Sequence, residues 1–181
     1  MKTGDLVTWE KAKDVLHLDD DQQELVEFLI SAASAQAEKI ADRFLAARDI
    51  VLTLDSSGGR EILLPSYPVN YITRVFKNED ELQPNLYSMR AQAGILRFKE
   101  RIQRGWDAIR FEGNIGYDPV PDDLQQAAIE IVSANLRRFA GSGGSVGIKS
   151  MSAQGAITTQ YEIDVPLSSR SVFMSYREAR V

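Results

Sequence analysis

The sequence contains no cysteine and a single histidine, His17. The missing thiols exclude disulfide bonds, thiolate catalysis and cysteine-ligated metals, and such a composition suits an intracellular assembly environment. A lone histidine that has only carboxylates as companions makes a poor metal site, and no serine lies in a nucleophile-elbow motif. We therefore expect no catalytic residue, no cofactor and no metal, and we predict that the chain is not an enzyme.

Long apolar runs and an excess of positive charge are also missing. No run approaches the ~20 apolar residues of a membrane-spanning helix. The N-terminal segment has no apolar stretch after Lys2, so we expect neither a membrane segment nor a secretory signal. The formal net charge is −5 over 181 residues. Proteins that grip DNA phosphates are usually basic, so a chain of this charge could surround DNA without binding it tightly.

Helical spacing of apolar residues dominates the first 47 residues. Residues 8–16 predict a short helix with Thr8 as its N-cap. The acids at 19–21 could suggest a metal site, but a capping box explains them better, formed by Asp20 with Gln23 or by Asp21 with Glu24. A long helix is then predicted over 22–47. Its apolar stripe consists of Leu25, Phe28, Leu29, Ala32, Ile40 and Phe44. The small residues at 31–37 would let another helix approach closely, either from this chain or from a neighbouring subunit.

The apolar period changes to two in the middle of the chain, which predicts a small, mostly antiparallel β-region over 50–112 with one face on the helices. A strand at 50–54, a turn at 56–59 and a strand at 61–64 have the pattern of a hairpin. Further strands are predicted at 71–77, 86–89, 95–98 and 106–112, and in the last of these Trp106, Ala108, Ile109 and Phe111 take the apolar positions.

A local basic cluster lies within this β-region and consists of Arg97, Lys99, Arg101 and Arg104. Three interpretations remain open. The cluster could meet DNA phosphates or acidic groups on a protein partner, or it could be a solvated strand edge that discourages edge-to-edge pairing.

The clearest local signal is a turn followed by a helix between Phe111 and Phe139. Gly113 and Gly116 hint at a phosphate loop, but the stretch lacks the further glycines and the lysine that such a loop needs. Asp122 with Gln125 predicts a capping box instead. The helical stripe that follows is Leu124, Ala127, Ala128, Ile131, Val132, Asn135, Leu136 and Phe139. Gly141 is expected to end this helix.

These patterns predict an α+β fold that is mainly helical. It would comprise a short N-terminal helix, a long helix, a small antiparallel β-region, a C-terminal core helix and then an extended C-terminal arm. A compact body would cover residues 1–140, a flexible linker 141–147 and the arm 148–181. Within the arm, 157–165 alternates like a strand, and 168–180 could form a short helix whose apolar face needs a surface to cover it. We expect partner contacts through Tyr161, Val172, Phe173, Tyr176 and Arg177.

Three stretches, in this order, resemble the head–tail connector (adaptor, or head-completion) proteins of long-tailed double-stranded DNA phages. The first is WEKAKDVLHLDDDQQELVEFLISAASAQAEKIADR at 9–43. The second is LLPSYPVNYITRV at 63–75, followed by the spaced Leu82, Tyr87 and Gly94-Ile95-Leu96. The third is FEGNIGYDPVPDDLQQAAIEIV at 111–132. No single stretch is diagnostic, and the resemblance rests on their order and spacing.

The resemblance implies a non-catalytic structural protein of the virion, assembled in the host cytoplasm and located in the neck at the head–tail interface. It would form a ring, a dodecamer in the particle, below the portal protein, and the ring would extend the channel through which double-stranded DNA passes. The portal protein and a tail-side neck or stopper protein would be its partners, reached in part through residues 148–181, and no membrane would be involved. Two alternatives remain: another neck or tail-completion protein of the same stack, and a DNA-binding packaging accessory factor that uses Arg97 to Arg104.

Overall fold

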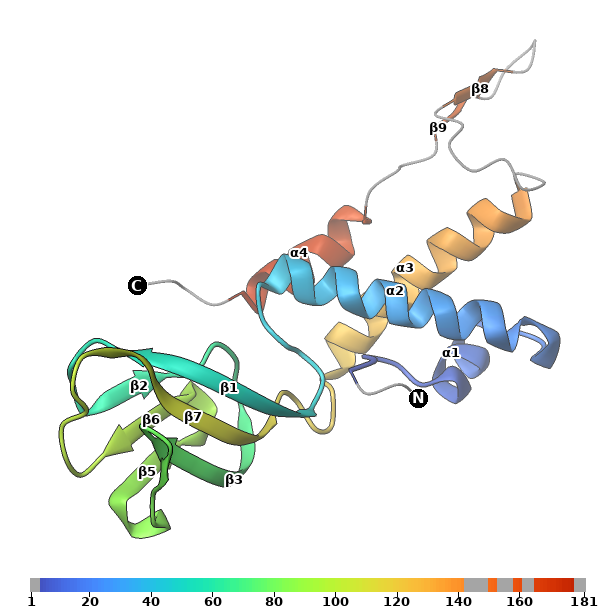
Figure 1. The fold of residues 1–181 in the computed structure, drawn as a ribbon. Coiled ribbons are helices and arrows are strands. Elements are labelled where there is room, and N and C mark those ends of the chain that lie inside the picture. The colour runs from blue at the N-terminus through green and yellow to red at the C-terminus, as the bar shows by residue number, and fades with distance from the viewer. Residues whose placement is uncertain (1–3, 142–149, 153–157, 161–164, 178–181) are drawn as a thin grey trace. The chain divides into compact units, whose positions relative to one another are not determined.

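The computed structural model describes residues 4–141, 150–152, 158–160 and 165–177. The chain divides into two compact units (Figure 1). We call Met1–Asp42 with Pro121–Val181 the helical unit, and Arg43–Val120 the β-unit. The prediction of a mainly helical fold is wrong, because the β-unit contains seven strands in two antiparallel sheets.

The described part of the helical unit contains four α-helices, one 3-10 turn and one short strand pair. The helices are α1 (Trp9–Leu16), α2 (Gln23–Ala41), α3 (Asp122–Gly141) and α4 (Leu167–Ser175). The turn is η1 (Asp20–Gln22), and the strands are β8 (Ser150–Ser152) and β9 (Thr158–Gln160), which pair antiparallel with each other.

The starts of the first two helices follow local rules. Thr8 caps α1, because its side-chain oxygen accepts a hydrogen bond from the Lys11 backbone N–H at 3.2 Å. The acids at 19–21 do form a capping box, but Asp19 and Gln22 make it, one residue before the predicted pair of Asp20 with Gln23 and two before that of Asp21 with Glu24. The predicted end of α2 at residue 47 is also wrong. Asp42 takes a left-handed conformation, φ +56°, and ends the helix at Ala41.

The core of the helical unit lies between α2 and the helices that pack against it. Its buried apolar side chains are Leu6, Val7, Ala12, Val26, Leu29, Ile30, Ala33, Ala37, Ala41, Leu124, Ala127, Ala128, Ile129, Ile131, Val132 and Phe173. The alanines on α2 let α3 and α4 come close to it, as the small-residue stretch predicted. Because α4 packs on both α2 and α3, the described end of the chain is a docked helix and not the extended arm that was expected.

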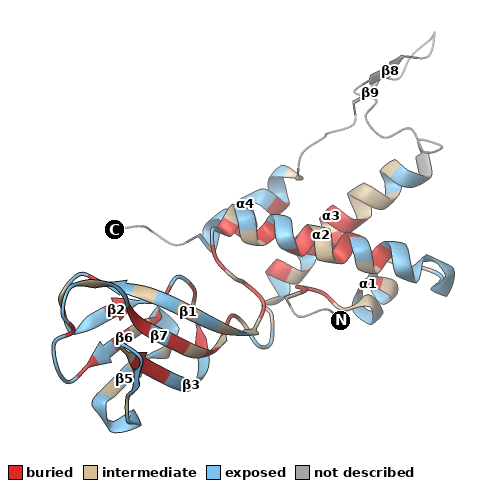
Figure 2. Cartoon of the chain, viewed as in Figure 1, coloured by how far each residue is buried: buried red, intermediate tan, exposed pale blue. Residues whose placement is uncertain are grey.

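The β-unit is two antiparallel sheets that enclose one apolar core. The first sheet has the order β1 (Arg48–Ser56), β7 (Gly105–Ile115), β3 (Val69–Lys77) and β4 (Asp80–Glu81). The second has the order β2 (Glu61–Leu63), β6 (Ile95–Phe98) and β5 (Tyr87–Arg90), and two 3-10 turns, η2 (Pro84–Leu86) and η3 (Ala91–Ala93), adjoin β5. The buried core is Ile62, Leu64, Val69, Val75, Leu96, Phe98, Ile102, Ala108, Ile109, Phe111 and Ile115 (Figure 2).

The predicted hairpin between residues 50–54 and 61–64 is wrong, because the two strands belong to different sheets. β1 pairs with β7, so that Leu52 lies opposite Phe111. β2 pairs with β6, so that Ile62 lies opposite Leu96. The turn at 56–59 therefore carries the chain from one sheet to the other. The sequence pattern had located these two strands but not their partners.

Both ends of the β-unit are held by close backbone and ring contacts. Gly116 has φ +106°, and a Cβ atom there would lie 2.5 Å from the Ala46 carbonyl oxygen. The close approach of these two backbone segments therefore requires glycine at position 116. The buried guanidinium of Arg43 stacks on Tyr67, at 3.7 Å from the ring centre, and lies 5.5 Å from that of Tyr117. Arg43 also donates a hydrogen bond to the Tyr67 carbonyl.

Candidate interaction surfaces

The residues expected to contact a partner from the C-terminal arm have unequal exposure. Phe173 is completely buried between helices of its own chain, and Val172 is partly buried. The Tyr176 hydroxyl donates to the carboxylate of Asp123 at the start of α3, at 2.8 Å. Arg177 is exposed. Phe173 and Tyr176 therefore anchor α4 within the helical unit, and of these four residues Arg177 has the most accessible side chain.

Hydrogen bonds near the start of α4 fix that helix against the middle of α3. The hydroxyls of Ser169 and Ser168 donate to one oxygen of Glu130, at 2.8 Å and 2.9 Å. The bond from Ser169 is the main reason that the pKa of the Glu130 carboxyl lies below its usual value, while partial burial acts in the opposite direction. Together with the contact between Tyr176 and Asp123, these bonds make α4 run antiparallel to α3.

Tyr161 and most of the predicted linker, residues 142–147, lie outside the described residues. The predicted strand at 157–165 is described only at β9, which pairs with β8 of the same chain, and at Val165. The roles expected for these segments stay predictions.

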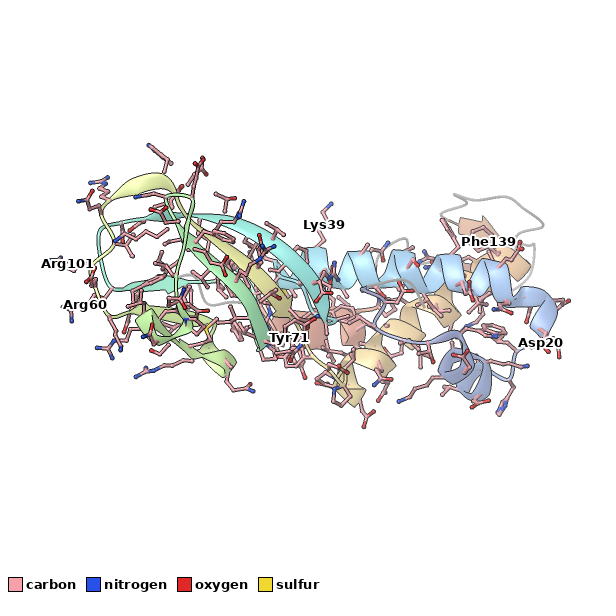
Figure 3. All side chains as sticks on the ribbon, turned by 60° about the horizontal axis from the view of Figure 1, so that its bottom comes forward. Asp20, Lys39, Arg60, Tyr71, Arg101 and Phe139 are labelled. Carbon is pink, nitrogen blue, oxygen red and sulfur yellow. The ribbon has the colours of Figure 1, made fainter. Side chains whose placement is uncertain are left out.

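The predicted basic cluster lies on the β-unit, and all four of its side chains are exposed. Arg97 faces Glu61 across a 3.6 Å ion pair, and Arg101 donates to the carbonyl of Gly58 at 3.4 Å. Arg60 lies at the same end as Arg101 (Figure 3), although it is far from the cluster in sequence. Sequence reasoning missed Arg60 because the pairing of β2 with β6, which brings it there, could not be read from the strand pattern.

Trp106 is the most exposed large apolar side chain of the described residues, at 87%. The prediction that it lies on the buried face of its strand is wrong. The register between β1 and β7 shifts between Leu54 and Ser56, and Asp107 adopts φ +50°. The backbone N–H of Asp107 donates to the carboxylate of Asp55 at 2.9 Å, which stabilises this conformation of Asp107. Trp106 thereby lines an open groove of about 760 Å³ together with Asp55, Ser56, Ser57, Glu61, Ile62, Leu63, Arg104 and Gly105.

Two apolar surfaces lie on the helical unit. The stripe predicted for α2 separates into two faces, because Leu29 is buried whereas Leu25 and Phe28 are exposed. A second surface is a mainly apolar groove of about 720 Å³ between α1 and α3. It is lined by Lys11, Val15, Leu16, Asp122, Gln125, Gln126, Ile129, Glu130, Ser133, Ala134, Arg137 and Pro166.

The described residues contain no group of three or more histidine, aspartate or glutamate side chains placed to hold a metal ion. His17 is an exposed residue at the end of α1, where it takes a left-handed conformation, φ +53°. No helix in the described part of the chain has the length and apolar character needed to cross a membrane.

Comparison with solved structures identifies the fold. The chain is similar to a protein from the neck of a native gene transfer agent particle computed with C12 symmetry, at 16% identity and a TM-score of 0.61, with 95% of this chain and 88% of that chain covered. It is similar to a protein from the neck of an empty particle computed with C6 symmetry, at 14% identity and a TM-score of 0.64, with 97% and 91% covered. A third match is the virion of the native gene transfer agent particle, at 16% identity, a TM-score of 0.59, and 97% and 91% coverage.

A search of curated protein sequences gives no match. The model of the head completion protein family, by contrast, matches residues 5–179. That range includes both units and confirms the resemblance drawn from the three sequence stretches. This chain belongs to the head completion protein family.

Proposed function

We propose that this head completion protein is a structural component of a virion neck, where it joins head to tail as one subunit of a ring around the DNA channel. The family match over residues 5–179 carries this proposal. The shared fold supports the ring, because related neck proteins occur in assemblies computed with C12 and C6 symmetry. A dodecamer is the expected stoichiometry, and closed cyclic symmetry gives every subunit the same two neighbours.

The role is structural rather than catalytic. Its support comes from the family and from the kinds of surface that the molecule offers, which are an exposed tryptophan, arginines and apolar helix faces. Such side chains are enriched where proteins bind one another.

The C-terminal segment, residues 148–181, contacts the portal protein or an adjacent subunit, and a tail-side neck protein binds elsewhere on the ring. Exposed Arg177 favours this for the segment's end, whereas Phe173 acts indirectly by holding α4 in place. Arg177→Glu should therefore weaken portal binding and leave the fold intact. Unchanged portal binding by that variant and by a chain ending at Arg177 would contradict the portal contact and leave the adjacent subunit as the partner.

The channel passes DNA without gripping it. The chain carries a formal net charge of −5, so the ring as a whole does not attract phosphates. Salt-dependent binding of the isolated protein to DNA at physiological ionic strength would count against this.

The decisive experiment is assembly without the protein. Particles made in its absence should accumulate as filled heads and separate tails, and purified protein should restore tailed particles, which electron microscopy can count. Normal numbers of tailed particles in its absence would refute the proposed function.

The exposed basic cluster favours one second candidate, a DNA-binding packaging accessory. Reversing the charge of Arg101 and Arg104 separates the two functions. A packaging factor would lose DNA binding, whereas a neck protein would keep its weak affinity for DNA and change, if at all, in assembly.

A further inference from the structure

Helix α2 is apolar on two sides, and only one of them is covered by its own chain. At 3.6 residues per turn, Leu25, Phe28, Ala32 and Ala35 fall within one arc, which is separate from the arc that carries Val26, Leu29, Ile30, Ala33 and Ala37. We call the first set the outer ridge. Phe28 is 62% exposed and Leu25 is 38% exposed. Lys39, three turns further along the same arc as Phe28, also has an exposed side chain (Figure 3). A helix that is apolar on both sides is normally covered on both sides.

The α1–α3 groove offers a surface of matching character on the same unit. Val15, Leu16, Ile129, Ala134 and Pro166 supply its apolar lining, and Val15 is 52% exposed. The groove shares no residue with the outer ridge. Its volume of about 720 Å³ is large enough to take an aromatic side chain and its neighbours along a helix. The helical unit thus carries a ridge and a groove as two separate apolar surfaces.

One pairing of opposite charges is available between the two surfaces. Exposed acids at Asp21 and Glu24 lie beside the outer ridge, at the N-terminal end of α2. Cations line the groove: Lys11 lies 3.3 Å from Asp122, and Arg137 donates to the carbonyl and hydroxyl oxygens of Ser133. The groove's other acid, Glu130, accepts from Ser168 and Ser169. An incoming acidic ridge would therefore meet Arg137, which is bonded to neutral groups of its own chain.

We infer that the outer ridge of one copy packs into the α1–α3 groove of the next copy. This inference rests on the proposed ring and names the surfaces that close it. A contact between two different patches of identical subunits is heterologous, and repeating it generates a ring when the rotation closes. A second copy is the favoured occupant because the apolar ridge with its acids and the apolar groove with Arg137 lie on the same unit. The ridge would place Phe28 against Val15 and Ile129, and Glu24 near Arg137.

The absence of cysteine provides a clean test. The pair Phe28→Cys with Val15→Cys introduces the sole thiols of the chain, both at exposed positions, so the fold should be retained. In particles assembled with this variant, oxidation or a short bismaleimide should link neighbours into a ladder extending beyond dimers. Each single variant should give no ladder. A matched control pair, Leu63→Cys with Val15→Cys, uses an apolar position on the β-unit that is 56% exposed, and it should also give none.

The outcomes separate this contact from the ring itself. If the double-cysteine protein is present in tailed particles but forms no ladder, the contact is refuted while the proposed function stands. If neither the double-cysteine protein nor the wild-type protein is found in any particle, the proposed function fails. Dimers formed by Phe28→Cys alone would indicate a ridge-to-ridge contact and overturn the inference.

Charge exchange gives an independent measure. Arg137→Glu should lower the yield of assembled rings on the order of tenfold, and adding Glu24→Arg should restore most of it. Loss of yield without any recovery in the double variant would contradict the pairing of these two positions. Circular dichroism of each variant confirms that the helices remain.

Discussion

The helical unit and the β-unit are stabilised and charged in different ways. In the helical unit, alanines on α2 are buried among larger side chains of the helices, of which Phe173 comes from α4. In the β-unit, branched and aromatic residues from strands distant in sequence form the core. The excess of acidic residues also belongs to the helical unit, because acids and bases nearly balance between Arg43 and Val120.

The two units also expose different kinds of surface. The helical unit leaves apolar helix faces uncovered at Phe28 and Val15. The β-unit displays Trp106 in a groove that Arg104 also lines. Extended apolar faces are typical of permanent subunit contacts, whereas an exposed tryptophan with an arginine beside it is typical of a local hot spot for a binding partner. We therefore expect the helical unit to contribute to the wall of the proposed ring and the β-unit to meet other components.

The largest effect on this comparison is expected from Phe173→Ala. The side chain is fully buried, so its loss should destabilise the helical unit by ~3–5 kcal/mol. Hydrogen exchange measured by mass spectrometry resolves the two units, and protection should fall in α2, α3 and α4. Met174→Ala is the matched control, because that neighbouring side chain is exposed. An equal loss of protection in β1, β3 and β7 would mean that the units unfold together and would break the comparison.

A substitution within β7 should produce the opposite pattern. At Gly113 a Cβ atom would lie 2.5 Å from the Tyr71 carbonyl oxygen and 2.9 Å from the Phe111 ring. Gly113→Ala should therefore destabilise the β-unit by about 3 kcal/mol, because the core must shift to accept the methyl group. Gly105→Ala, in the same strand, is the control, since nothing lies within 4 Å of the added atom. Hydrogen exchange monitored during denaturant unfolding should show the loss of stability in the strands of the β-unit alone. Similar stability of the two variants would contradict the close approach.

The outcome of sequence reasoning also differs between the units. Helices are specified by contacts a few residues apart, so α1, α3 and the docked residues of α4 could be located from spacing and caps. The strand at 95–98 was located as well. The buried stripe of α3 was predicted correctly at Leu124, Ala127, Ala128, Ile131 and Val132. The last residue of the predicted stripe, Phe139, is exposed instead.

Two features could not be predicted from the sequence. They are the pairing of distant strands and the division of the alanine-rich helix α2 into a buried and an exposed face. Alternation reveals which face of a strand is buried but not which strand lies beside it, so the pairing of β1 with β7 was missed. The shift before Ser56 turns Trp106 outward against its pattern. On α2, alanines occur on both sides, and one apolar stripe could not be distinguished from two. The surfaces proposed for assembly therefore required the structure.

A smaller effect is expected from Arg43→Ala, which tests the contact between Arg43 and Tyr67 at the start of the β-unit. The guanidinium is buried, stacks on Tyr67 and donates to a backbone carbonyl. Its removal should destabilise the β-unit by about 2 kcal/mol, the usual scale for a hydrogen bond from a charged donor together with a cation–π contact. Thermal unfolding measures the loss. Arg110→Ala, which removes an exposed arginine stacked at 3.9 Å on Phe76, should cost less. Equal losses would mean that burial adds nothing to the stacking of Arg43.

The smallest expected effect is a pH dependence confined to the helical unit. Hydrogen bonds from Ser169 and Ser168 lower the pKa of Glu130 in the folded protein, so folding favours its ionised form. The resulting stability is fully present above the ordinary glutamate pKa of about 4.3 and is lost as pH falls through the lower folded value. Because the group is largely solvated, the contribution should stay below ~1 kcal/mol.

Glu130→Gln should therefore weaken the docking of α4 slightly at neutral pH and make no difference once the wild-type carboxyl is protonated. Hydrogen exchange of α4, measured at pH 7 and below pH 4, compares the variant with the wild type when Glu130 is ionised and when it is protonated. Glu24→Gln, which changes an exposed acid on α2, controls for the loss of one negative charge. A difference from wild type that persists unchanged in acid would show that the glutamine acts through packing. The pKa of Glu130 would then have no part in holding α4 on α3.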